Sequence, residues 1–456
     1  MTSTADRDVP DSSPSEAPAK QLTVRGAAVL GIGSMIGAGI FALLGEAGAV
    51  AGAAVWMSFL IAGIVAVLIG YVCVKLGIRY PTSGGLITYL IAGFGRGRLT
   101  GITAWLGYIS AVVIVTAMVA VSFGGYATSL FIGADAGPAW DNFFITAVIV
   151  VMVGVNLVGA QFVARAQTLI VACVLIVFSV FIVVTITDLN PDLLAFSGYP
   201  KFSKIISSVA LTFFAYLGFN VITFAVGDLR DPARNLPKAM YSALGITALV
   251  YVLISLGVFG TLTTAQVVEY GETAIAEAAR PALGDAGFTV MAIAALLSTA
   301  ASTNATLYAS SNLTGSLADE GLFPEIVGDK SRLGRHAGLL ITAGAVLVVA
   351  NLVDLSAIAS VGSAVALVIF LLVGIAGWRR RKDTGSNPAI IIMALLITST
   401  VLTFFAIDTL ENAPETFVAI IAIGVLAVTF DAIGRRGRPT DTSPTSGTRS
   451  AARRDG

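Results

Sequence analysis

Charge is scarce in this sequence of 456 residues. Aspartate, glutamate, lysine and arginine together make up 12% of it, about half the share that is typical of a soluble domain. Hydrophobic residues make up 56%, and the mean hydropathy is +0.89. So few charges cannot cover the surface of a soluble protein of this length, which excludes a soluble enzyme and a disordered chain. The 27 basic and 27 acidic residues cancel, so no overall positive field is present to attract nucleic acid.

Cysteine and histidine are rarer still. Cys73 and Cys173 are the two cysteines, and because both lie inside apolar stretches they exclude a disulfide framework and a zinc site. The single histidine, His336, argues against a histidine-based metal centre. The phosphate-binding pattern G-x-x-x-x-G-K-[ST] of ATP-driven pumps is absent as well. We therefore expect no metal, no cofactor, no catalytic residues and no enzymatic activity.

Long apolar stretches are what the sequence has instead. A bilayer core about 30 Å thick needs about 20 helical residues to cross it. Twelve stretches meet this requirement, over residues 25–50, 53–76, 99–127, 142–161, 166–188, 204–227, 238–261, 286–316, 337–353, 355–378, 388–408 and 414–433. We therefore predict an all-α integral membrane protein with about 12 transmembrane helices in one domain over residues 22–433.

The two ends of the chain and the loops set the expected orientation. Residues 1–21 and 434–456 are polar and predict disordered tails. Of the 27 lysines and arginines, 24 lie in these tails and in the even-numbered loops, and three lie on the opposite side. The loops on that opposite side hold acids instead, among them Glu269, Glu272 and Glu277. Because basic loops stay in the cytosol, we expect a multi-pass protein of the cytoplasmic membrane with both termini cytosolic.

Two of the stretches are interrupted in their apolar middle. The first carries glycines at positions 31, 33, 37 and 39, although each glycine costs a helix interior about 1 kcal/mol relative to alanine. The sixth carries Gly218 between aromatic residues, followed by the polar Asn220. The first and sixth stretches occupy matching positions in two five-helix halves. Paired glycine-interrupted helices in such positions are the best sequence pointer to a transporter's central site, so we predict a break in both.

An interrupted helix exposes backbone groups that lipid cannot satisfy. Amides at the N-terminus of the outer half-helix, after Gly37, Ala38 and Gly39, would attract an anion. Carbonyl groups at the ends of the two inner half-helices would attract a cation. A zwitterionic α-amino acid meets both requirements at once, so the pattern favours a site for such a molecule.

Four motifs follow one another in an order that is found in a known superfamily. They are Gly37-Ala38-Gly39-Ile40-Phe41, Tyr80-Pro81-x-x-Gly84-Gly85 with Tyr89, Phe213 to Asn220 followed by Asp231-Pro232-x-Arg234-Asn235-x-Pro237, and Glu320-Gly321-Leu322-Phe323-Pro324. With them the sequence resembles the amino acid–polyamine–organocation (APC) superfamily permeases of the amino acid transporter type, over roughly residues 22–433. The resemblance implies a 5+5 inverted repeat with broken helices 1 and 6, plus two extra C-terminal helices.

Residue roles carried over from the superfamily centre on the two breaks. The implied substrate-binding residues are Met35, Ile36, Gly37, Ala38, Gly39, Phe214, Leu217, Gly218 and Asn220. In this scheme the amides of residues 37–39 hold the substrate carboxylate. The carbonyls of Met35, Phe214 and Leu217 hold its ammonium group. The ring of Phe214 would lie over the substrate as the inner gate.

The sequence departs from the superfamily where ion coupling is concerned. Ala38 replaces a serine, and Asn220 replaces a glutamate that couples ions in some members. Some proton-coupled members carry a buried lysine in the fifth helix, but the corresponding position here lies near Val174, in an apolar stretch without lysine. Hydroxyl groups of the eighth stretch offer oxygen ligands for Na⁺, or they bond their own helix backbone. These residues are Ser298, Thr299, Ser302 and Thr303. Coupling to Na⁺, coupling to H⁺ by another route, and exchange without an ion stay open.

No charged residue falls at the centre of a predicted membrane helix, where an unpaired charge would be expensive. We therefore expect a secondary active transporter that moves a neutral, apolar amino acid by alternating access. An amine or polyamine permease, an amino acid exchanger and a transporter-fold nutrient sensor are the alternatives. The expected partners are a small-molecule amino acid and membrane lipid, with no nucleic acid, and the oligomeric state stays open.

Overall fold

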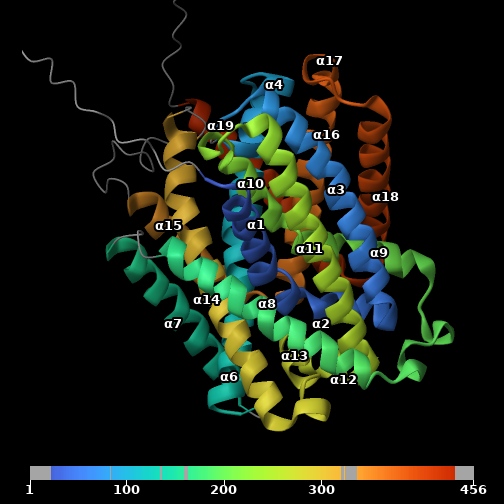
Figure 1. Cartoon of the computed structure of the whole chain (residues 1–456). Helices are drawn as coiled ribbons and strands as arrows, with labels where there is room; N and C mark the ends of the chain where they lie inside the picture. Colours follow the sequence, from blue (N-terminus) through green and yellow to red (C-terminus); the bar gives the residue numbers. More distant parts are fainter. Residues whose placement is uncertain are drawn as a thin grey trace, which may run out of the picture.

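The chain is seen in a computed structural model that describes residues 22–82, 84–133, 136–158, 163–319, 323 and 336–436. Within these ranges it is almost entirely helical and contains no β-strand. Figure 1 shows one bundle of helices, with α4 and α17 at one end and α12 and α13 at the other. The predicted all-α membrane fold is confirmed.

The first half of the bundle ends with the long helix α8. Its helices are α1 (Val24–Ala38), α2 (Ile40–Ala51), α3 (Val55–Arg79), α4 (Gly85–Phe94), α5 (Arg98–Tyr108), α6 (Val115–Phe131), α7 (Pro138–Val158) and α8 (Val163–Thr187). A 3₁₀ turn, η1 (Gly52–Ala54), separates α2 from α3, and a π-helical segment, η2 (Ile109–Ile114), joins α5 to α6.

The second half begins with two 3₁₀ turns, η4 (Pro191–Leu194) and η5 (Phe196–Gly198). Its helices are α9 (Phe202–Ala215), α10 (Asn220–Phe224), α11 (Pro232–Thr261), α12 (Thr264–Tyr270), α13 (Ala274–Glu277), α14 (Arg280–Asp319), α15 (Ala337–Leu352), α16 (Leu355–Arg379), α17 (Arg381–Thr384), α18 (Pro388–Asn412) and α19 (Pro414–Arg436). Further 3₁₀ turns are η6 (Leu217–Phe219), η7 (Val226–Asp228) and η8 (Gly271–Thr273).

Each of the twelve predicted stretches contains helix within the described residues. The eighth stretch lies within α14, which begins at Arg280 and bends at Gly284. By length and composition, ten helical stretches of the described residues could cross a membrane, with α2, η1 and α3 taken as one. The count of twelve crossings stays a prediction. The tail over 1–21 and, apart from Phe323, the motif over 320–324 lie outside the described residues, as does the tail over 434–456 except for 434–436, which end α19.

Burial divides the bundle into inner and outer helices. In the stretch from α9 to α10, 78% of the residues in its apolar 18-residue segment are buried. In α7 and in α19 the corresponding share is 17%. The outer helices carry exposed apolar side chains such as Val158, Leu169 and Leu352. An apolar surface of this extent is stable against lipid tails and unstable against water. The interrupted stretches therefore lie inside the bundle, away from the expected lipid.

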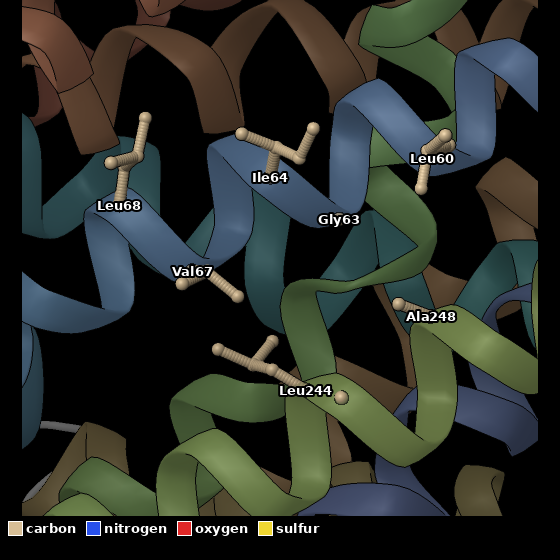
Figure 2. A pocket seen from close by; sticks show the side chains of 8 residues that line it. Leu60, Gly63, Ile64, Val67, Leu68, Leu244 and Ala248 are labelled. Atoms are coloured by element: carbon tan, nitrogen blue, oxygen red, sulfur yellow. The ribbon is translucent and has the colours of Figure 1, made fainter.

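A shallow groove of about 230 Å³ lies on this outer surface between α3 and α11. Figure 2 shows its lining, which comes from Leu60, Gly63, Ile64, Val67 and Leu68 of α3 and from Leu244, Gly245 and Ala248 of α11. No polar or charged side chain lines the groove. It suits lipid tails, and it offers nothing that could hold the charged ends of an amino acid.

Glycine allows neighbouring helices to approach closely, as at the crossing of α4 and α16. A Cβ atom added at Gly93 would lie 2.7 Å from the Cα atom of Ala376. That distance is too short for any real Cβ contact, and the atom in the way belongs to the backbone. The two helices are therefore as close as their backbones allow.

We predict that Gly93→Ala lowers the thermal unfolding midpoint of the detergent-purified protein, because overpacking of this kind costs about 1–3 kcal/mol. Gly154→Ala in α7 is the matched control, since no described atom lies within 4 Å of its added Cβ. The control is expected to match or exceed the parent protein, because alanine is the better helix former. An equal or higher midpoint for Gly93→Ala than for Gly154→Ala would contradict the close packing.

Candidate functional site

The predicted break in the first stretch is confirmed, and it is narrow. α1 ends at Ala38, α2 begins at Ile40, and Gly39 between them has φ −105° and ψ −78°. Gly37 and Ala38 remain helical. A Cβ atom added at Gly39 would lie 2.6 Å from the carbonyl oxygens of both Met35 and Ala215. Only glycine fits between these two carbonyl groups.

The sixth stretch is broken as well. α9 ends at Ala215, the turn η6 follows over Leu217–Phe219, and α10 begins at Asn220. Gly218 in this turn lies directly on α1, because an added Cβ would lie 2.7 Å from the Cα atom of Met35. The two interrupted stretches therefore meet backbone to backbone.

Tyr251 of α11 joins the two breaks. Its hydroxyl oxygen lies 2.6 Å from the carbonyl oxygen of Met35 and 3.2 Å from that of Ala215. Both carbonyl groups belong to ends of helices, where the intrahelical partner of the backbone is lost. The side chain is fully buried, so its hydroxyl group satisfies backbone groups that no water or lipid would reach.

Sequence reasoning missed Tyr251. A weak signal was present, because it is a hydroxyl-bearing residue within the apolar run over 248–260. A buried tyrosine hydroxyl usually finds a hydrogen-bond partner. The sequence gives no indication that this partner is the backbone at both breaks, because the residues involved are far apart along the chain.

Gly37 places α1 against the hydroxyl-rich part of α14. A Cβ atom added at Gly37 would lie 2.8 Å from the carbonyl oxygen of Ser298 and 2.8 Å from the Cβ atom of Ser302. All four predicted ion-site residues are buried. The Thr299 hydroxyl donates to the Ala295 carbonyl at 2.7 Å, and the Thr303 hydroxyl donates to the Thr299 carbonyl at 2.9 Å. The two threonines thus bond their own helix, the second of the roles that the sequence left open.

Phe214 is buried between the second break and two neighbouring helices. A Cβ atom added at Gly362 of α16 would lie closest to the Cζ atom of this ring, 2.8 Å from its Cε1 atom, and 2.8 Å from the Cγ2 atom of Ile114 in η2. Ser110 of η2 donates to the Gly362 carbonyl at 3.2 Å. π-Helical segments of this kind occur frequently at functional sites. The ring predicted to gate the substrate therefore stands where α9, η2 and α16 meet.

The remaining predicted residues differ in their surroundings. Ile36 is buried, and Leu217 is partly buried, with its carbonyl accepting from the Asn220 amide. The Asn220 side chain accepts a hydrogen bond from the Thr223 hydroxyl at 3.2 Å within α10. The side chain of Ala38 is not among those described. The structure therefore brings Met35, Gly37, Gly39 and Gly218 together, with Phe214 at the edge and Asn220 bonded to its own helix.

Known proteins share this sequence pattern along most of the chain. A family model described as "Amino acid permease" matches residues 22–431. The inner membrane transport protein YbaT of Escherichia coli K12 is 29% identical over 409 residues, which cover 90% of this chain and 95% of that relative.

Two relatives from Bacillus subtilis match shorter parts. The methylthioribose transporter is 28% identical over 328 residues, 68% of this chain and 70% of its own. The branched-chain amino acid permease BcaP is 27% identical over 253 residues, 52% of this chain and 54% of its own. Together with the apolar helices and the family match, these similarities place the chain in a family: it is a multi-pass membrane transporter of the amino acid permease family, within the APC superfamily.

Proposed function

We propose that the chain is a secondary active transporter that moves a neutral amino acid across the cytoplasmic membrane by alternating access. The observation that carries this proposal is the meeting of the two interrupted stretches at Gly39 and Gly218, inside the bundle. The orientation with both termini in the cytosol belongs to the same proposal and rests on the distribution of lysine and arginine. The molecule moves its substrate without converting it.

The backbone at the breaks can meet both charged ends of an amino acid. The N-terminus of α2, which begins directly after Gly39, presents amide groups and the positive end of a helix dipole to the substrate carboxylate. The carbonyl groups at the ends of α1 and α9 face the substrate ammonium group, as the superfamily scheme implies for Met35 and Phe214. In the proposed orientation α9 is the outer half of the sixth stretch, so its end takes the place of the inner half-helix that was expected from the sequence. This division needs no charged side chain at the site.

The surroundings of the breaks favour a neutral, apolar side chain. Ile36, Ile40, Phe41 and Phe214 are all buried and apolar. A substrate with a charged side chain would have to leave water without gaining a partner of opposite charge, which is expensive at membrane depth. The name of the branched-chain permease supports the same substrate class. The methylthioribose relative makes a substrate without a carboxylate group the main alternative.

Purified protein in proteoliposomes is expected to take up radiolabelled neutral amino acids such as leucine and valine with saturable kinetics. Uptake is measured with an inward Na⁺ gradient, with an inward H⁺ gradient, and with internal amino acid but no ion gradient. The condition that drives uptake identifies the coupling mode. Liposomes without protein are the control, and absence of amino acid uptake under all three conditions would overturn the proposal.

The sodium role of α14 has its own test. If the Na⁺ gradient drives uptake, Ser298→Ala with Thr299→Ala is expected to abolish the sodium dependence, because both oxygen ligands are removed. Uptake by this double variant with unchanged sodium dependence would show that these hydroxyl groups serve only their own helix.

Tyr251→Phe is expected to lower the uptake rate at least about fivefold. The change leaves the carbonyl groups of Met35 and Ala215 without their shared partner, and an unsatisfied buried polar group costs about 1–3 kcal/mol. Tyr241→Phe is the matched control on the same helix, because Tyr241 is 36% exposed and lies far from both breaks. Equal rates for the two variants would contradict the role of Tyr251, and size-exclusion profiles check that both are folded.

A further inference from the structure

Three short elements between α11 and α14 cover the ends of α2 and α6. They are α12, η8 and α13, and we call residues 264–277 the cap. Figure 1 shows α12 and α13 at the same end of the molecule as α2 and the last turns of α6, opposite α4 and α17. In the proposed orientation this is the outer end, where α2 leads to the candidate substrate site.

The cap rests on α2 and α6 through two glycines. A Cβ atom added at Gly45 of α2 would lie 2.5 Å from the carbonyl oxygen of Gly271. A Cβ atom added at Gly125 of α6 would lie 2.7 Å from the carboxyl carbon of Glu272. The Glu272 side chain is therefore inserted against the backbone of α6, where it loses most of its contact with water.

The charges around Glu272 do not neutralise it. The titratable and charged groups on the elements around it are Glu46 of α2, Tyr126 of α6, Asp141 of α7, Glu269 and Tyr270 of α12, Glu277 of α13 and Arg280 and Asp285 of α14, with Asp354 next to Glu46. Arg280 pairs with Glu277, Nε to Oε2 at 2.7 Å, and with Asp285. Among the described residues no lysine or arginine forms an ion pair with Glu272.

This setting changes the affinity of Glu272 for a proton. Burial raises the pKa of its carboxyl from an ordinary value of 4.5 to about 7, and it outweighs the hydrogen bond to the backbone of Glu272 itself, which lowers this pKa. The nearby carboxylates of Asp141 and Glu46 raise it further. In an open cap the carboxyl would return to water and to its ordinary pKa. The closed cap therefore binds a proton more tightly than the open one, and a fall in pH through 7 favours closure.

A buried tyrosine lies next to Glu272 in this region. Tyr126 follows Gly125 in α6, is fully buried, and its hydroxyl makes no hydrogen bond within the described residues. The carboxyl groups of Glu272 and Glu277 act on it electrostatically. Its ring meets that of Phe41 edge to face, with centroids 5.7 Å apart, two residues beyond the Gly39 turn. Tyr126 thus lies between the candidate substrate site and the cap.

We propose that the Glu272 carboxyl is a proton-binding site that controls closure of the cap: a proton from the outer solution neutralises it and allows the cap to seat on α2 and α6. When the proton leaves, the carboxylate is better solvated by water than by the contact with Gly125, and the cap lifts. The proton returns to the outer side, so this site sets the rate of the cycle without supplying its driving force. The inference rests on the proposed transport function, in which the outer end of α2 is opened and covered in turn.

Amino acid exchange at equal pH on both sides of the membrane tests this control. Because the pKa is 4.5 in the open cap and about 7 in the closed cap, the equilibrium constant for closure falls about tenfold between pH 6 and pH 8. Exchange of a labelled neutral amino acid in proteoliposomes is expected to slow in the same range, by up to about tenfold. Glu272→Gln should hold the pH 6 rate throughout, and Glu269→Gln, an exposed acid of the same cap, should keep the parent profile. An unchanged pH profile in Glu272→Gln overturns the proposal.

A cap measurement without substrate separates this inference from the transport function. Ala276 of α13 is fully buried, so Ala276→Cys, with Cys73→Ala and Cys173→Ser, reports opening of the cap to a membrane-impermeant thiol reagent. Labelling relative to an exposed Glu269→Cys control should rise about tenfold from pH 6 to pH 8, and Glu272→Gln should abolish the rise. A pH-independent ratio with Glu272 in place overturns the proposal, even if the protein transports amino acids. A pH-dependent ratio that Glu272→Gln abolishes supports the proton site, even if no amino acid is exchanged.

Discussion

The structure depends on how backbone polar groups are satisfied where two helices break inside an apolar bundle. Lipid offers no hydrogen bonds, so each break needs a partner from the protein itself. Tyr251 supplies one hydroxyl group to the ends of α1 and α9, and the neighbouring Tyr216 bonds the Phe59 carbonyl of α3 at 3.0 Å. The two tyrosine rings lie 5.1 Å apart. Through them α3 and α11 fix the geometry of both breaks.

Several close contacts of the interrupted stretches run through glycine, beside side-chain contacts such as that of Phe41 with Tyr126. Gly218 lies on the backbone of α1, Gly37 on α14, and Gly45 on the cap. Backbone contacts of this kind bring helices close together. Because no side chain is inserted between the residues of the neighbouring helix, a helix can move without first withdrawing one. They are suited to elements that separate and rejoin during transport. They also explain why glycine is abundant in the first stretch despite its cost to a helix.

The fold could be predicted from the sequence because lipid imposes a simple rule on helix length, and the breaks could be predicted because glycine is unfavourable in a helix. The partners of the breaks could not, since Tyr251 is separated from Met35 by 216 positions and no local pattern marks it. The sequence left two roles open for Thr299, an ion ligand or a hydrogen bond to its own helix. The choice depends on the direction of its hydroxyl group, which only the folded helix shows. Glu272 was one acid among several in the outer loops. Its burial comes from contact with Gly125, which only the folded chain creates.

The π-helical segment η2 has a consequence for the register of the third stretch. A π turn accommodates one residue more than an α turn, so the residues of α6 are rotated by about 100° relative to a continuous α-helix from α5. This rotation sets which side of α6 carries Gly125 and Tyr126, which lie 11 and 12 residues beyond the end of η2. The extra residue therefore changes the direction in which the side chains of α6 point relative to those of α5. As a result α5 and α6 can present small or aromatic residues to different neighbouring helices, although together they form one continuous helical stretch.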